Sequence, residues 1–216
     1  WKFFNISRKM KPDLIHVWGN MVAIYSIPAK ILLRIPLINS QIADAPLNVK
    51  RNLLNVSIPL FFSDIIVANS KAGKVAYNIP LAKVIYNGFS FERLANLRDK
   101  SVVRESLGIQ SENVIGMVAN FTDRKDYKTF LRAANLVLDK RNDVTFICVG
   151  AGDFSRLQNI VTERNRDKVI FLEKQHEIEN IINTFTVGVL STFSEGISNA
   201  VMEYMALGKP VIVTRG

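Results

Sequence analysis

From Val114 to the end of the chain, short apolar runs alternate with longer segments whose apolar residues recur every three to four positions. The runs of strand length cover residues 114–119, 144–149, 169–172, 187–190 and 211–214. The segments of helical period cover residues 127–139, 154–163, 177–185 and 198–207. Strands that alternate with helices in this way are typical of βαβ units, so the pattern predicts a parallel sheet with helices packed on it.

Two of the predicted helices have especially clear signals. Along 127–139 the apolar positions repeat as i, i+3, i+4, i+7 and i+8, which predicts one inward face made of Phe130, Ala133, Ala134, Val137 and Leu138. The helix over 198–207 has a capping side chain at its start, Ser198 or Asn199, and Gly208 and Pro210 at its end.

The first 83 residues repeat this alternation less cleanly, and we interpret them as the second half of another α/β domain. Their pattern predicts strands at 14–17, 37–39 and 64–68 and helices at 28–33 and 49–61. Near residues 83–89 the charge balance changes and Asn87-Gly88 predicts a turn, followed by a polar stretch of helical character to Leu107. We therefore place two domains at residues 1–85 and 86–216.

Both ends of the chain indicate a fragment. The sequence opens on Trp1 inside an apolar and basic segment, and it stops at Gly216 just after a predicted strand. The expectation is thus that both predicted sheets are incomplete, with opening strands missing from the first domain and closing helices missing from the second.

Composition narrows the class of protein. The 216 residues are 48% hydrophobic and 22% charged, which excludes a disordered or fibrous chain. The single cysteine, Cys148, lies in the predicted strand 144–149 and has no internal disulfide partner, which favours the reducing cytoplasm. The best apolar stretch, 22–38, is broken by Lys30, Arg34 and two prolines, so no segment of membrane-spanning length is predicted.

The positive charge is concentrated at one end. The formal net charge is +9, and residues 1–83 carry 11 Lys and Arg against 3 Asp and Glu, whereas residues 84–216 carry 17 against 16. A local excess of this kind fits an anionic partner, or simply a solvated cationic face. Nucleic acid is disfavoured because no zinc-finger spacing, RNP-type motif or basic heptad is present.

The apolar and basic stretch 27–37 leaves two alternatives open. It could rest on an anionic membrane surface, which would make the protein peripheral at the inner face of the membrane. The favoured alternative is a buried crossover helix whose two cations, Lys30 and Arg34, extend to the surface.

The strongest candidate site surrounds two acids eight residues apart, Glu195 and Glu203. A predicted strand ends near Ser191, and the next helix exposes N–H groups at about 199–201, where a phosphate can bind. Glu203, one turn further in, is placed to accept hydrogen bonds from neutral hydroxyls such as those of a ribose. The competing interpretation is an ordinary strand-loop-helix corner with two surface acids.

The same segment resembles a known family. The pattern Glu-x7-Glu from Glu195 to Glu203, followed by Met-Ala-x-Gly-x-Pro-Val-Ile, is similar to the donor-site signature of the retaining GT-B glycosyltransferases of family 4. The likeness extends over nearly the whole chain, through segments 11–17, 64–70, 84–88, 118–126, 149–153 and 169–173.

This resemblance implies a GT-B fold of two Rossmann-like domains with parallel sheets. Residues 86–216 would hold a nucleotide-sugar donor, and residues 1–85 a glycan or lipid-linked acceptor. Glu195 would contact the donor sugar and Glu203 the ribose, while Lys125 matches the lysine that neutralises the diphosphate. The remaining donor contacts are expected from Gly196, Ser198, Asn199, Ala200, Asn120, Arg124 and Gly152.

Two positions depart from the family pattern. Asn120 stands where an arginine is usual, so stabilisation of the leaving group is weaker unless Arg124 compensates. Trp18 stands where many members have a histidine, which puts acceptor-side catalysis in doubt. We expect His16, inside an apolar run, to be a packed core histidine rather than a proton carrier.

The predicted activity is transfer of a hexose-type sugar, with retention of configuration, from a nucleotide diphosphate to a hydroxyl of a glycan or glycolipid precursor. The alternatives are a nucleotide-sugar-binding module without turnover and a GT-B epimerase. No cofactor is expected beyond the sugar nucleotide as co-substrate, and no metal, because no His/Cys/Asp cluster has ligand spacing. A phosphate loop of the Gly-x4-Gly-Lys-Ser/Thr type is also missing from the sequence, which disfavours a P-loop NTPase.

Overall fold

The computed structural model describes residues 1–41 and 56–214. The chain divides into two compact units, which are described separately. The first unit comprises Trp1–Asn87 with Ser194–Ile197, and the second comprises Gly88–Phe193 with Ser198–Gly216.

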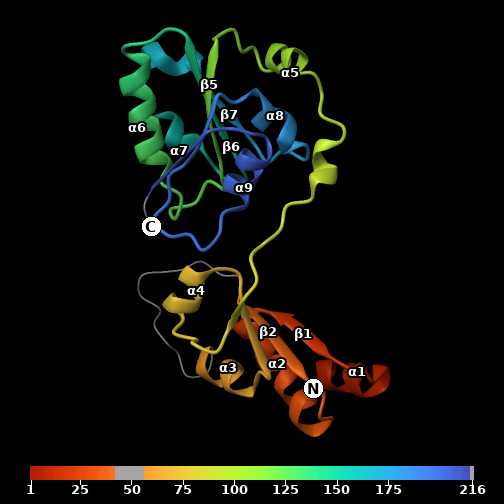
Figure 1. Cartoon of the computed structure of the whole chain (residues 1–216). Helices are drawn as coiled ribbons and strands as arrows, with labels where there is room; N and C mark the ends of the chain where they lie inside the picture. The colour runs from red at the N-terminus through yellow and green to blue at the C-terminus, as the bar shows by residue number, and fades with distance from the viewer. Residues whose placement is uncertain (42–55, 215–216) are drawn as a thin grey trace. The chain divides into compact units, whose positions relative to one another are not determined.

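The second unit is built on a parallel five-stranded sheet with the order β7-β6-β5-β8-β9 (Figure 1). Its strands are β5 (Asn113–Val118), β6 (Val144–Val149), β7 (Val169–Leu172), β8 (Val187–Leu190) and β9 (Val211–Val213). The central strand β5 lies between β6 and β8, so the order reverses there. In open parallel sheets ligands bind at such a reversal, beyond the carboxyl ends of the strands.

Helices cover both faces of this sheet (Figure 1). They are η2 (Phe91–Leu94), α5 (Lys100–Ser106), α6 (Tyr127–Leu138), α7 (Ser155–Gln158), η3 (Glu163–Lys168), α8 (Ile178–Thr184) and α9 (Asn199–Ala206). The α/β architecture with parallel strands that the sequence predicts is confirmed.

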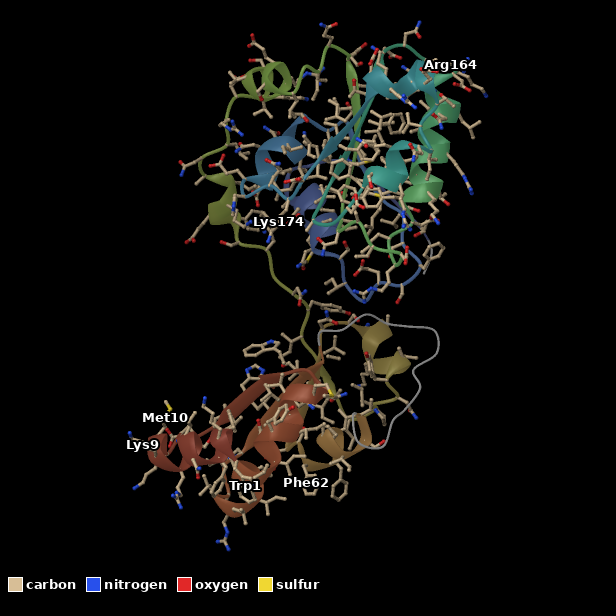
Figure 2. All side chains as sticks on the ribbon, turned by 180° about the vertical axis from the view of Figure 1, so that it is seen from behind. Trp1, Lys9, Met10, Phe62, Arg164 and Lys174 are labelled. Carbon is tan, nitrogen blue, oxygen red and sulfur yellow. The ribbon has the colours of Figure 1, made fainter. Side chains whose placement is uncertain are left out.

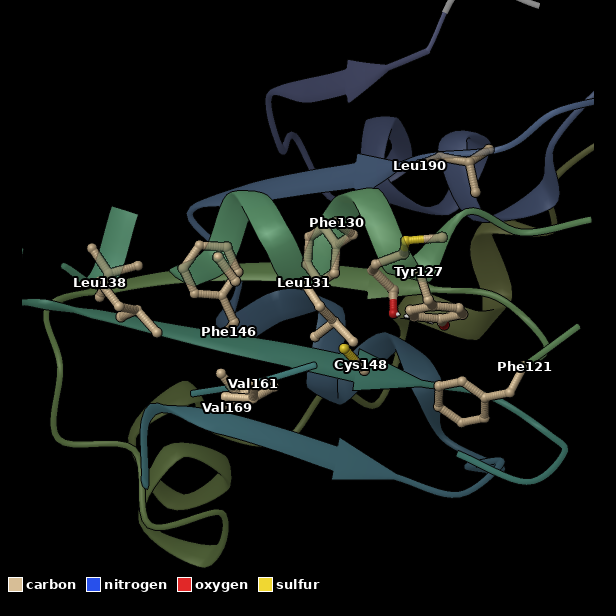
Figure 3. Packing of buried hydrophobic residues seen from close by; sticks show 13 residues of the cluster. Phe121, Tyr127, Phe130, Leu131, Leu138, Phe146, Cys148, Val161, Val169 and Leu190 are labelled. Carbon is tan, nitrogen blue, oxygen red and sulfur yellow. Dashed lines mark hydrogen bonds between the residues drawn. The ribbon is translucent and has the colours of Figure 1, made fainter. Parts of the chain in front are cut away.

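The α6 face of the sheet holds the larger hydrophobic cluster (Figure 3). Phe130 and Leu131 of α6 pack on Phe146 and Cys148 of β6, which is buried along its whole length. Burial raises the pKa of the Cys148 thiol well above its usual range, as expected for a thiol in an apolar environment. The predicted inward face of this helix was partly wrong, because Leu131 is buried where Ala133 was expected to be.

The opposite face packs against α8 and α9 through Ile182, Phe185 and Tyr204. Two strand glycines make room for these rings. A Cβ on Gly116 would lie 2.0 Å from Phe185, and one on Gly188 would lie 2.4 Å from Tyr204. The glycines therefore let α8 and α9 approach the sheet at close range.

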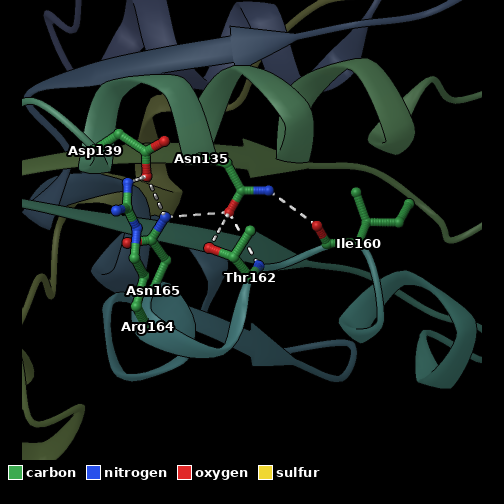
Figure 4. Close-up of polar contacts among 6 residues, drawn as sticks. All are labelled: Asn135, Asp139, Ile160, Thr162, Arg164 and Asn165. Atoms are coloured by element: carbon green, nitrogen blue, oxygen red, sulfur yellow. Dashed lines mark hydrogen bonds and ion pairs between the residues drawn. The ribbon is translucent and has the colours of Figure 1, made fainter.

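A polar clamp holds α6 to the chain that precedes β7 (Figure 4). The Asn135 amide donates to the carbonyl of Ile160 at 2.9 Å, and its oxygen accepts from the Thr162 N–H at 3.1 Å. Asn165 donates to Asp139 at 3.1 Å, and Arg164 pairs with the same carboxylate. These hydrogen bonds pair the polar groups of the chain before β7, which has no long helix whose backbone hydrogen bonds could pair them.

The first unit has a parallel four-stranded sheet in chain order. Its strands are β1 (Ile15–Trp18), β2 (Leu37–Gln41), β3 (Ile65–Ala68) and β4 (Lys83–Val84). Its helices in the described residues are α1 (Lys2–Met10), α2 (Asn20–Leu32), α3 (Ile58–Phe62) and α4 (Lys71–Ala76). Buried residues of β1, α2 and β2 form one small cluster, and those around β3 another.

Many large apolar side chains of the first unit remain at its surface. Figure 2 shows Lys9 and Met10 projecting from the end of α1, and Met10 is 73% exposed. On α2, Lys30 is partly exposed and pairs with Asp64, while Arg34 follows the helix in an exposed turn. A helix is present where the crossover helix was expected, but it begins at Asn20 and ends before Arg34. The expectation that it is buried was wrong, because large side chains such as Tyr25 and Leu32 are 66% and 61% exposed. A role for residues 1–83 at a membrane surface stays a prediction.

Several predicted elements differ from the structure. The helix expected over 154–163 is only α7, followed later by the 3-10 turn η3, because Asn135 rather than helical hydrogen bonds holds the chain there. The helix expected over 49–61 lies mainly outside the described residues, and α3 includes its end. The turn predicted at Asn87-Gly88 is not present, because residues 85–90 have no regular structure. The sequence analysis missed α1, α4 and β4 altogether.

His16 is the clearest correction. It is exposed, whereas Ile15 and Val17 on either side are buried, because alternate residues of a strand face opposite sides of the sheet. Its ring stacks on Trp18 at 4.1 Å, and its Nε2 lies 2.7 Å from the hydroxyl oxygen of Ser40. His16 is therefore not a packed core histidine.

Within residues 1–41 and 56–214, none of the helices combines the length and apolar character needed to span a membrane.

Candidate donor-binding site

The candidate site lies at the carboxyl edge of the five-stranded sheet, where the loops after β5, β6 and β8 meet. The loop after β5 is tied to the loop after β6 by two backbone hydrogen bonds, from Ala119 to Val149 at 2.9 Å and from Phe121 to Ala151 at 2.8 Å. A Cβ on Gly150 would lie 1.8 Å from the Ala119 oxygen, so only glycine permits this approach.

Tyr127 stabilises the start of the loop after β5. Its side chain is 1% exposed, and its hydroxyl donates to the carbonyl of Ala119 at 2.7 Å. Burial raises the pKa of this phenol far above its usual value, so it stays a neutral hydrogen-bond donor. The end of β5 is thereby fixed in position, together with the residues that follow it.

Lys125 is brought next to the loop that follows β8. It forms an antiparallel bridge with Thr192, and the two residues beside it add backbone bonds from Asp126 to Ser191 at 2.9 Å and from Phe193 to Arg124 at 3.1 Å. Asp126 then caps α6 by accepting from the Thr129 N–H at 3.0 Å. Lys125 therefore stands directly before a helix N-terminus, at the reversal of strand order.

A pocket of about 500 Å³ opens beside Lys125 within the second unit. Its lining includes Phe121, Lys125, Lys128, Asp153, Arg156 and Phe193. The lining carries three carboxylates, Asp123, Asp126 and Asp153, beside its three cations, so its formal charges balance, and its aromatic residues can pack against the flat part of a ligand. The described residues contain no group of three or more His, Cys, Asp or Glu side chains placed to hold a metal ion.

The other predicted donor contacts of the second unit lie at the same edge. Asn120 and Arg124 are exposed residues of the β5 loop, and Gly152 adopts a φ of 113° in the β6 loop. Ser198 is the N-cap of α9 and accepts from the Val201 N–H at 3.4 Å. The cap takes one of the three amides expected to be exposed, and phosphate binding by Asn199 and Ala200 stays a prediction.

Glu203 is buried rather than a surface acid, with 8% of the residue exposed. Burial raises its pKa, and the guanidinium of Arg93, 2.9 Å away, opposes that rise. The same guanidinium pairs with Glu179 of α8. This network was missed in the sequence because Arg93 lies 110 positions before Glu203, so no local pattern contains the pair.

Glu195 and Gly196 lie in the loop between β8 and α9, in the segment Ser194–Ile197 that belongs to the first unit. The expected contact of Glu195 with the donor sugar stays a prediction, as do the ligand contacts of the other residues.

Comparisons with known proteins show what this chain is similar to. Residues 112–216 match the family model described as "Glycosyl transferases group 1". The O-antigen biosynthesis glycosyltransferase WclY of Escherichia coli is 29% identical over 167 residues, which are 75% of this chain and 46% of that protein. A Campylobacter jejuni protein, N,N'-diacetylbacillosaminyl-diphospho-undecaprenol alpha-1,3-N-acetylgalactosaminyltransferase, is 26% identical over 53% of this chain and 30% of its own length.

Among solved structures, Anabaena Alr3699/HepE in complex with UDP-glucose superimposes with a TM-score of 0.82 at 22% identity, over 98% of this chain and 62% of that one. This likeness confirms the GT-B type of fold. The chain spans about half the length of the curated relatives named above, or less.

Proposed function

We propose that this chain, whose residues 112–216 form a glycosyltransferase group 1 domain, acts in the transfer of a sugar from a nucleotide diphosphate to a hydroxyl acceptor. The observation that carries the proposal is the bridge between Lys125 and Thr192. It places the cation and the loop leading to the α9 N-terminus at one edge of one sheet, where neighbouring strands β5 and β8 end.

Each of the predicted site residues has a distinct role in the proposed reaction. The ammonium of Lys125 neutralises the negative charge that develops on the diphosphate as the glycosidic bond breaks. The amides of Asn199 and Ala200 bind the phosphate oxygens, and Glu203 accepts hydrogen bonds from the ribose hydroxyls. Glu195 contacts the donor sugar, and Arg124 supplies the positive charge that Asn120 lacks.

The finer parts of the proposal rest on the family resemblance of residues 195–210. They are a hexose-type donor, retention of configuration, a reaction without a metal ion, and an acceptor that is a glycan or a lipid-linked precursor. A UDP sugar is the first donor to test, since the similar Anabaena structure contains UDP-glucose.

Turnover of the full-length protein with a panel of nucleotide sugars tests the proposal. We expect release of the nucleoside diphosphate, with Lys125→Ala lowering the rate by about 10²- to 10³-fold, the effect typical of removing one group that stabilises developing charge. Lys140→Ala is the matched control, because Lys140 follows the opposite end of the same helix and is exposed.

The other outcomes distinguish the alternatives. Binding of a nucleotide sugar without turnover would favour a binding module, and a changed sugar configuration on an intact nucleotide would favour an epimerase. Equal loss in Lys125→Ala and Lys140→Ala would contradict the assigned role of Lys125.

A further inference from the structure

Arg93 occupies a position that the donor-site signature does not include. It lies in η2, a short 3-10 turn more than 100 positions before α9 in the sequence. Its Nη2 atom nevertheless lies 2.9 Å from Oε1 of Glu203 and also pairs with Oε1 of Glu179. One guanidinium nitrogen thus links two carboxylates from two different helices.

Both carboxylates are buried. The Glu203 side chain is 11% exposed and that of Glu179 is 7% exposed, whereas Arg93 is 42% exposed. Two carboxylates close together in a buried position repel each other, and each loses hydration, unless a cation pairs with them. Arg93 is the cation that pairs with both of them.

The described charged groups that act on the Glu203 carboxylate are Arg93 and Glu179. Its helix, α9, packs on α8, which contributes Glu179, and on β8 and β9, whose side chains are all uncharged. Burial raises the pKa of Glu203, Arg93 lowers it and Glu179 raises it again. Without Arg93, burial and the charge of Glu179 would therefore both favour the protonated form of Glu203.

Arg93 is itself held in place by aromatic contacts. Its guanidinium carbon lies 5.1 Å from the centre of the Phe89 ring, and Phe89 packs edge-to-face on Phe91 at 5.4 Å. A planar guanidinium fixed on a ring loses little further freedom when it pairs with a carboxylate. The contact with Glu203 is thus preorganised before any ligand arrives.

We propose that Arg93 is a positioning residue for nucleotide recognition: it fixes the Glu203 carboxylate through Oε1 and so presents Oε2 to the ribose hydroxyls. This inference rests on the proposed function, because it takes the ribose to lie over α9. It adds a residue from the chain between the two sheets to a site otherwise built from the loops after β5, β6 and β8.

Calorimetric titration of the full-length protein with UDP and with 2′,3′-dideoxy-UDP tests it. Arg93→Ala should weaken UDP binding by about 10- to 100-fold, the range for hydrogen bonds to a charged group. It should leave binding of dideoxy-UDP unchanged, since that ligand lacks both hydroxyls. Arg98→Ala is the matched control: Arg98 pairs with the exposed Glu177 at 3.7 Å, and its loss should change neither affinity.

The pH dependence separates positioning from a purely structural role. Without Arg93 the pKa of Glu203 rises, so the acid takes up a proton as the pH falls and becomes a poorer acceptor. The ratio of UDP affinities between parent and Arg93→Ala should therefore widen from pH 8 to pH 6, while the ratio between parent and Arg98→Ala stays constant.

Two further variants keep the test valid if Arg93→Ala fails to fold. Arg93→Lys retains a cation and should bind UDP with intermediate affinity. Glu179→Gln removes the repelling charge and should leave UDP affinity within about twofold of the parent, because Arg93 still fixes Glu203.

The outcomes separate the two proposals. If the parent binds no nucleoside diphosphate, the proposed function fails. If the parent binds UDP but Arg93→Ala and Arg93→Lys bind it equally well or more tightly, or lose UDP and dideoxy-UDP affinity alike, the positioning role is wrong and the proposed function stands.

Discussion

The two units both consist of a parallel sheet with helices, but they treat their apolar residues differently. The second unit buries apolar side chains against both faces of its sheet, in two clusters that include Phe130, Phe146, Phe185 and Tyr204. The first unit has smaller clusters and leaves large side chains such as Phe61 exposed. Apolar side chains are therefore buried more completely in the second unit than in the first.

The two units also differ in where the candidate site and the excess positive charge lie. The second unit holds its candidate site on strand ends that are fixed by buried groups, such as Tyr127 beneath Ala119. The excess positive charge lies instead in residues 1–83. Supporting residues that are held by buried contacts suit a site that must place a phosphate-binding cation accurately.

The largest expected effect compares one phenylalanine from each unit. Phe130→Ala removes a ring that is 4% exposed and should lower the free energy of unfolding of the second unit by about 3–5 kcal/mol. Phe61→Ala removes a ring that is 82% exposed and should change stability by less than about 0.5 kcal/mol. Urea unfolding of both variants measures the difference, and similar losses would contradict the contrast in burial.

A second comparison uses two glycines. Gly116→Ala places a methyl group against the Phe185 ring, and we expect a loss of about 1–3 kcal/mol from overpacking. Gly88→Ala, at the junction of the two units, meets no atom within 4 Å and should be close to neutral. Thermal unfolding of the two variants checks this, and an unchanged melting temperature for Gly116→Ala would show that α8 does not approach β5 so closely.

The smallest expected effect is the pH dependence that Asp64 gives to the stability of the first unit. The hydrogen bond from Lys30, aided by the Leu37 N–H at 2.7 Å, lowers the pKa of Asp64 below its ordinary value of 3.8. A carboxyl with a lower pKa in the folded state stabilises that state above the ordinary value and loses this contribution as the pH falls through the folded value. Because the pair is partly exposed, the contribution should stay below about 1 kcal/mol.

Asp64→Asn is the variant that checks it. The difference in unfolding free energy between parent and Asp64→Asn should be present at pH 6 and should shrink toward pH 2. A difference that is constant over this range would show that Asp64 acts through something other than its charge.

The sequence predicts the second unit well for a physical reason. Its strands are short apolar runs with turn residues on both sides, and three of them, 144–149, 169–172 and 187–190, begin and end at the predicted residues. A side-chain cap of α9 at Ser198 or Asn199 was also predicted, and Ser198 is the N-cap. For these elements the neighbouring residues in the sequence were sufficient to predict the structure.

Other features depend on contacts that local patterns do not contain. The predicted helix over 154–163 was wrong because Asn135 donates a hydrogen bond to the carbonyl of Ile160, which lies 25 positions later. The exposure of His16 follows from which face of β1 is covered, and the pairing of Arg93 with Glu203 joins residues 110 positions apart. The sequence therefore predicts Lys125 and Glu203 as candidate site residues, but it does not predict the long-range contacts around Glu203.

Hydrogen–deuterium exchange of the full-length protein, with and without a bound nucleotide sugar, tests the central claim most directly. Binding at the carboxyl edge of the second sheet should slow exchange in residues 119–126 and 198–204, and leave residues 139–143 and 163–168 at the opposite edge unchanged. Slower exchange at 139–143 and 163–168, with none at 119–126 and 198–204, would contradict the account.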